Sequence, residues 1–118
     1  MSTPDSTRRI ADYIENMLEA TRLVKTYVEG LSKADFMLDR RTQQAVILNL
    51  IIIGEAASRI VNDYPEFAAA NIDIPWRQMR GMRNRMAHGY FDINIDVVWE
   101  TVRSSLPELE SRLKAIKA

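Results

Sequence analysis

A nine-residue stretch in the middle of the chain, Ala45–Ile53, is apolar at all but one position. Its β-branched residues are compatible with a strand, but the flanks Arg40–Gln44 and Gly54–Arg59 continue a helical period without turn residues. We therefore predict one long helix from an Asp39 N-cap to about Asn62. Its apolar side chains point in nearly every direction around the axis, which requires burial on all sides. In a domain this small, we expect one of those faces to meet a second subunit.

The segment before this helix has apolar residues in steps of three and four. They form one helical stripe from Arg8 to Leu31, and Gly30 stands where a C-terminal stop is expected. Ser32 and Asp35 then have the spacing of a capping box, which predicts a short helical turn directly after them.

Prolines divide the second half of the chain. Pro65 should end the long helix, because proline disfavours helical conformation in the residue before it, and Pro75 should open the next helix. The last helix is expected to be capped by Asp92 or Asn94. Pro107 lies inside its apolar stripe and should kink or interrupt it. These patterns predict a single all-α domain over residues 1–118, an antiparallel up-and-down bundle of about four to five helices that dimerises.

Composition excludes several kinds of site. The chain has no Cys and one His, so it has no disulfide, no thiolate zinc site and no motif that needs two histidines. A metal site would need oxygen ligands alone or a single His, and we predict neither a metal ion nor a cofactor. The net charge is zero, which argues against a protein that coats nucleic acid through bulk electrostatics.

The N-terminal residues 1–9 are polar and have no apolar signal-peptide core. The longest apolar stretch is also far shorter than the roughly 20 residues of a membrane span. We therefore expect a cytoplasmic protein that has no membrane partner.

The segment Pro75–Phe91 is locally basic, although the whole chain is neutral. It has four arginines and no acidic residue before Asp92, and the only histidine, His88, lies near its end. Arginine offers planar, permanent charge for phosphate oxygens, and histidine exchanges protons near neutral pH. Together these groups are a minimal set for cleaving RNA without a metal, and we expect Arg80 and Arg85 to bind RNA phosphates.

Spacing within this segment limits what one chain can do. Arg83 and His88 are five positions apart, so on a regular helix their side chains point about 140° apart around the axis. Asn84 and His88 are four positions apart and lie on the same helix face. Asn84 would then orient the imidazole, and a symmetric dimer would supply a second histidine. A structural histidine and a solvated arginine face fit these residues as well. Glu55 would pair with an arginine across the bundle or lie beneath the site. From spacing alone, Tyr90 is expected to be an ordinary aromatic residue of a loop.

Residues Arg83–Tyr90 have an Arg, four residues, a His, one residue and a Tyr. This pattern resembles the signature of the HepT-like toxins, which belong to the HEPN superfamily of small helical proteins. The resemblance extends over about Ile10–Leu113. It includes four further blocks in the family's order: Asp39–Ala45, Ile53–Ala57, Ile74–Trp76 and Val98–Val102.

The resemblance implies a metal-independent endoribonuclease toxin that acts as a homodimer. Arg83 and His88 would be the catalytic pair, and Asn84 a supporting residue. The implied partner is an MntA-type nucleotidyltransferase antitoxin, which would silence the nuclease by transferring AMP from ATP to Tyr90. Two alternatives remain: a non-catalytic module that binds a nucleotide or the nucleotidyltransferase, and a purely structural dimeric bundle.

Overall fold

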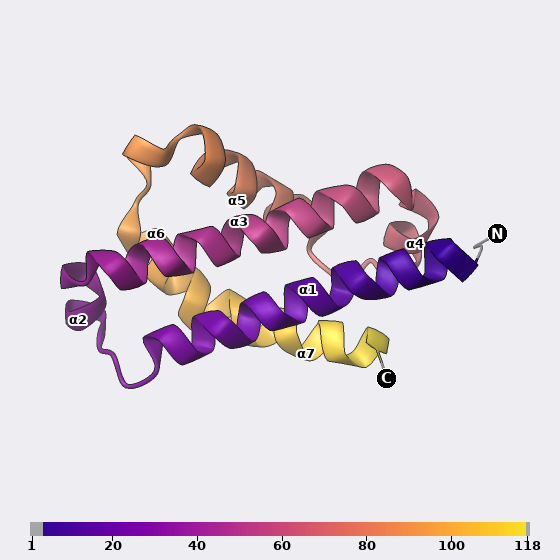
Figure 1. Ribbon diagram of the computed structural model, residues 1–118. Helices are drawn as coiled ribbons and strands as arrows, with labels where there is room; N and C mark the ends of the chain where they lie inside the picture. The colour runs from indigo at the N-terminus through magenta and orange to yellow at the C-terminus, as the bar shows by residue number, and fades with distance from the viewer. Residues whose placement is uncertain (1–3, 118) are drawn as a thin grey trace.

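The computed structural model describes residues 4–117 (Figure 1). The helices are α1 (Pro4–Val28), α2 (Lys33–Leu38), α3 (Arg40–Asp63), α4 (Pro65–Ala70), α5 (Trp76–His88), α6 (Ile95–Glu100) and α7 (Leu106–Lys117). A 3-10 turn, Tyr90–Asp92, follows α5, and a π-helical turn, Thr101–Ser105, joins α6 to α7. Residues 4–117 contain no strand, which confirms the predicted all-α class.

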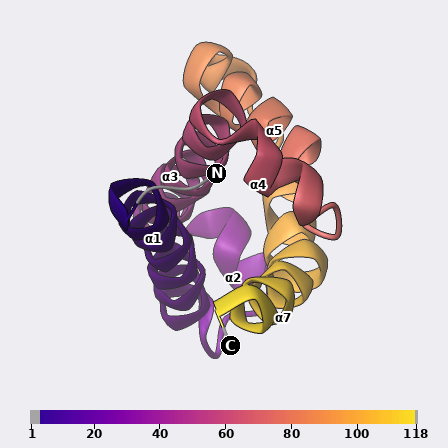
Figure 2. The same cartoon turned by 90° about the vertical axis from the view of Figure 1, so that its right-hand side faces the viewer.

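Helix α3 lies between α1 and α5. It packs along α1 on one side and along α5 on the other, and α7 returns beside α1 (Figure 2). The core between these helices is apolar, and its largest fully buried side chains include Phe36, Met17, Leu18, Leu50, Ile53, Ile60 and Leu113. The arrangement is the helical bundle that the apolar stripes predict.

The predicted helix ends are largely confirmed. Gly30 has φ +77°, the left-handed conformation that favours glycine after a helix. Ser32 and Asp35 form a complete capping box at α2, and the side chain of Asp39 caps α3. Of the two candidates for the last cap, Asn94 is the residue that accepts from the first turn of α6.

Proline sets the less regular parts of the fold. Pro65 begins α4, a short helix that the sequence analysis did not predict, and Pro75 immediately precedes α5 instead of lying inside it. The interruption expected at Pro107 is confirmed. Because Pro107 has no N–H, the backbone widens into the π-helical turn, in which the N–H of Leu106 bonds to the carbonyl of Thr101.

Helix α3 is long and apolar enough to cross a membrane, but 56% of its most apolar window is buried inside the bundle. It therefore behaves as a core helix. Its burial is incomplete within one chain, because Leu48 is 57% exposed and Ile52 is 39% exposed. The expectation of burial on every side is thus not met by a single chain, and an apolar face of α3 stays uncovered.

Candidate functional site

Helices α3 and α5 cross in close contact at Gly54. A Cβ built on Gly54 would overlap the Cβ of Arg83 and would stand 2.7 Å from the carbonyl oxygen of Met79. Real Cβ atoms do not tolerate such contacts, so a glycine is required at this crossing. The missing side chain places Arg83 directly on the surface of α3.

The guanidinium of Arg83 is held by two side chains of α3. Its Nη2 donates a hydrogen bond of 2.9 Å to the hydroxyl of Ser58, and its Nε lies 3.7 Å from Oε2 of Glu55. The other carboxylate oxygen of Glu55 accepts from Nε of Arg59 at 3.3 Å. Only 23% of the Arg83 side chain is exposed, so the orientation of its charge is restricted.

The Arg83 Nε is buried and makes no hydrogen bond to the part of the chain that the structure describes. The Glu55 carboxylate lies just beyond hydrogen-bond distance and supplies charge compensation only. The expectation that Glu55 pairs with an arginine across the bundle is confirmed. Ser58 was missed by sequence reasoning, although it stands one helical turn after Gly54 and is a lone hydroxyl on a buried surface.

His88 is exposed and is the last residue of α5. Because α5 stays helical as far as His88, the angular separation of about 140° from Arg83 applies. Within one chain, the two side chains therefore leave the helix in different directions. Asn84 is exposed one turn before His88 on the same face, but among residues 4–117 no hydrogen bond joins the two.

Tyr90 lies in the 3-10 turn just after His88, and it is 48% exposed. Its hydroxyl oxygen accepts a long hydrogen bond of 3.5 Å from Nε2 of Gln44 on α3. Its ring packs edge-on against Phe91, which is itself almost fully exposed. Helix α3 therefore contacts both ends of the motif, at Arg83 through Ser58 and at Tyr90 through Gln44.

The two arginines expected to bind phosphate lie on different sides of α5. Arg80 and Asn84 line one groove, which is formed with α4 and the end of α3. Arg85 faces the opposite flank, where it lines cavities against α6, the π-helical turn and α7. The structure thus brings Arg80 and Asn84 together in one groove, which Arg85 does not line.

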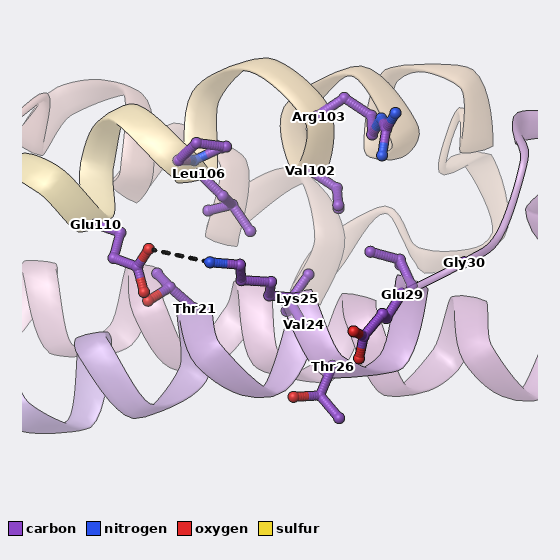
Figure 3. Close-up of a pocket in the computed structure, with 12 residues that line it drawn as sticks. Thr21, Val24, Lys25, Thr26, Glu29, Gly30, Val102, Arg103, Leu106 and Glu110 are labelled. Carbon is purple, nitrogen blue, oxygen red and sulfur yellow. Dashed lines mark ion pairs between the residues drawn. The ribbon is translucent and has the colours of Figure 1, made fainter.

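A cavity of about 640 Å³ lies elsewhere, between α1 and the segment from the π-helical turn to α7 (Figure 3). Lys25 and Glu110 face each other across it, with Nζ and Oε1 4.0 Å apart. Its walls include none of the motif residues. Among the described residues, no group of three or more His, Cys, Asp or Glu side chains is placed to hold a metal ion.

Comparisons with known proteins agree on one family. The family model described as "Ribonuclease HepT-like" matches residues 17–116. A protein of Thermococcus cleftensis named "Probable ribonuclease HepT" is 38% identical over 106 residues, which are 90% of this chain and 94% of that protein. A protein of Caldanaerobacter subterraneus named "Putative RNase" is 35% identical, over 88% of this chain and 90% of its own length. No solved structure gave a significant match.

Proposed function

The chain belongs to the HepT-like ribonuclease family, and we propose that it is an endoribonuclease toxin that cleaves RNA without a metal ion, as a homodimer. The family and its RNase-named relatives support a ribonuclease function of the HEPN type. Toxicity, metal independence and dimeric action are proposed beyond that family function. The observation that supports catalysis is the restrained guanidinium of Arg83, which Ser58 and Glu55 hold on a basic helix that ends in the one histidine of the sequence.

In the proposed reaction, the imidazole of His88 takes the proton of a ribose 2′-hydroxyl. The 2′-oxygen attacks the adjacent phosphorus, and the guanidinium of Arg83 stabilises the charge that develops on the phosphoryl oxygens. The bond from phosphorus to the 5′-oxygen breaks, and that oxygen receives a proton from an imidazolium. The products are a 2′,3′-cyclic phosphate and a 5′-hydroxyl, so protons and atoms balance.

A second copy of the chain would supply the second acid–base group. Gln44, Leu48 and Ile52 follow steps of four and share one face of α3. Gln44 contacts Tyr90, and the two apolar side chains beside it are exposed. A symmetric contact through this face would cover exposed apolar surface and would bring two Arg-to-His motifs toward each other.

Tyr90 is the proposed site of silencing by an MntA-type nucleotidyltransferase. Its hydroxyl would attack the α-phosphorus of ATP, form a phosphodiester with AMP, lose its proton to solvent or a base, and release pyrophosphate. The half-exposed position of Tyr90, two residues after His88, supports this assignment. The attached adenylate would add bulk and negative charge where the RNA phosphate must bind. RNA and ATP as substrates place the proposed activity in the cytoplasm.

The proposal is tested with purified protein and single-stranded RNA in excess EDTA, beside His88→Ala and Arg83→Ala purified in the same way. We expect cleavage by the wild type only, with 2′,3′-cyclic phosphate ends. Cleavage that requires a divalent metal would overturn metal independence, and equal cleavage by His88→Ala would overturn the role of His88.

The second candidate function is a non-catalytic module that binds a nucleotide or the nucleotidyltransferase. One observation favours a non-catalytic role: the contacts of Arg83 with Ser58 and Glu55 also suit a purely structural arginine. Under this alternative, no purified form cuts RNA, and His88→Ala binds the nucleotidyltransferase as the wild type does.

A further inference from the structure

A groove of about 550 Å³ runs beside α5, next to the motif but outside it. One wall is apolar and comes from three helices, with Val61 of α3, Ala68 of α4 and Trp76 at the start of α5. The indole N–H of Trp76 is shared by the carbonyls of Ala68 and Asn71, each 3.1 Å away. These bonds fix the aromatic ring, so the apolar wall is preformed.

Gly81 also lines this groove, and packing does not explain it. A glycine inside a helix costs about 0.5–1 kcal/mol relative to alanine. At Gly54 that cost is required by the close approach of Arg83, but a Cβ on Gly81 would meet only Nη1 of Arg85, at 3.4 Å. The neighbouring helices therefore tolerate a side chain at Gly81. Because glycine has no side chain, the groove stays open at this position.

The other lining residues are charged or polar. Arg77, Arg80 and Asn84 line the groove, and they continue to His88 in steps of three, four and four along α5. Asn84 precedes His88 by four residues, a rise of about 6 Å along the helix. Among residues 4–117, no acidic side chain lines the groove. A ligand with a flat apolar face would pack on the apolar wall, and a hydrogen-bonding edge would meet the amide. A phosphate on the same ligand would bind the arginine side chains.

We propose that this groove binds the unstacked base of a nucleotide adjacent to the scissile phosphate in single-stranded RNA. The base lies against Trp76, the Asn84 amide bonds to its edge, and Arg77 and Arg80 bind the flanking phosphate. The proposal rests on the proposed ribonuclease function, and it names the substrate class as single-stranded RNA. An apolar side chain of a protein partner is the competing occupant.

The test separates base contacts from phosphate contacts. Anisotropy is measured on the His88→Ala protein with a fluorescein-labelled RNA octamer and with a matched octamer of abasic ribose phosphates. Gly81→Leu, which fills the groove and also meets Nη1 of Arg85, should weaken binding of the RNA octamer about tenfold and binding of the abasic octamer much less. Ala34→Leu, at an exposed position of α2 near the other end of α3, is the matched control and should change neither.

Ala69→Trp, which fills the groove from an exposed position of α4, gives a second variant in case Gly81→Leu fails to fold. Equal weakening of both octamers by the filling variants would overturn the proposal, and so would no effect on either. A change in oligomeric state with RNA binding intact would assign the groove to a protein contact instead. Because binding is measured without cleavage, failure of the wild type to cut RNA in EDTA would overturn the proposed reaction alone.

Discussion

Arg83 on α5 donates a 2.9 Å hydrogen bond to the hydroxyl of Ser58 on α3. The two residues are 25 positions apart in the sequence, and the contact forms only because Gly54 lets the helices touch at this turn. One arginine of a locally basic helix is thereby turned toward α3 and restrained there, half-buried, while Arg77, Asn84 and His88 stay exposed.

Replacing Gly54 with alanine should destabilise the protein by about 1–3 kcal/mol, because the new Cβ overlaps Arg83 and presses on the backbone of Met79. Thermal unfolding followed by circular dichroism should show a melting temperature lower by several degrees. Gly81→Ala on the same helix pair is the control, and should stabilise slightly because its Cβ meets no backbone atom. A Gly54→Ala protein as stable as the wild type would contradict the close crossing.

Ser58→Ala should keep the fold and lower the rate of RNA cleavage by about 10- to 100-fold, because the Arg83 guanidinium loses its fixed orientation. The loss should appear in kcat, with KM for RNA little changed. Ser58→Thr retains the hydroxyl and should recover part of the rate. If both variants lose the same activity, packing around Ser58 matters and its hydrogen bond does not.

Leu48→Arg should convert the proposed homodimer to a monomer and abolish cleavage, because it places a charge on the uncovered apolar face of α3. Light scattering after size-exclusion chromatography measures the mass directly. Ile72→Arg changes an 81% exposed apolar residue outside that face and should leave the mass unchanged. If the wild-type protein is monomeric at micromolar concentration, the uncovered apolar face of α3 does not form a dimer interface.

Tyr90→Phe should retain nuclease activity and lose silencing, because phenylalanine has no hydroxyl to accept AMP. The readout is intact-protein mass after incubation with ATP and an MntA-type nucleotidyltransferase, followed by the RNA cleavage assay. The wild type should gain the mass of AMP and stop cutting. A Tyr90→Phe protein that still gains AMP would assign the modification to another residue.

Stability should depend on pH through Asp39. Hydrogen bonds from the side chain and backbone of Thr42 hold the pKa of Asp39 below its usual value of 3.8. The folded state therefore favours the ionised form, and this contribution is complete above pH 3.8 and is lost as the pH falls through the lower folded value. Asp39→Ala should lower the melting temperature clearly at pH 7 and by less at pH 2.

Asp12→Ala, which changes an exposed carboxylate on α1, is the control for that series. It should have little effect on the melting temperature at either pH. If the deficit of Asp39→Ala were the same at pH 2 and pH 7, the ionised form of Asp39 would not be the source of the stability.

Local sequence determined most of the helical framework. Several helix ends are set by contacts within a few residues, so the sequence alone is sufficient to find them. They are marked by Gly30, the Ser32 and Asp35 capping box, Asp39 and Asn94. The Arg83-to-Tyr90 spacing likewise identified the motif and its family. Helix α4 escaped prediction because six residues are too few to show an apolar period.

Tertiary structure alone decided what each motif residue contacts. The sequence separates Arg83 from Arg80 and Arg85 only through the motif spacing and does not show what any of them contacts. The crossing at Gly54 holds Arg83 on α3, whereas Arg80 and Arg85 line different grooves of α5. The same crossing makes Ser58 part of the site. Helix periodicity tells which residues share a face, but the approach of another helix sets which face is buried. That approach depends on side-chain volumes from segments distant in the sequence.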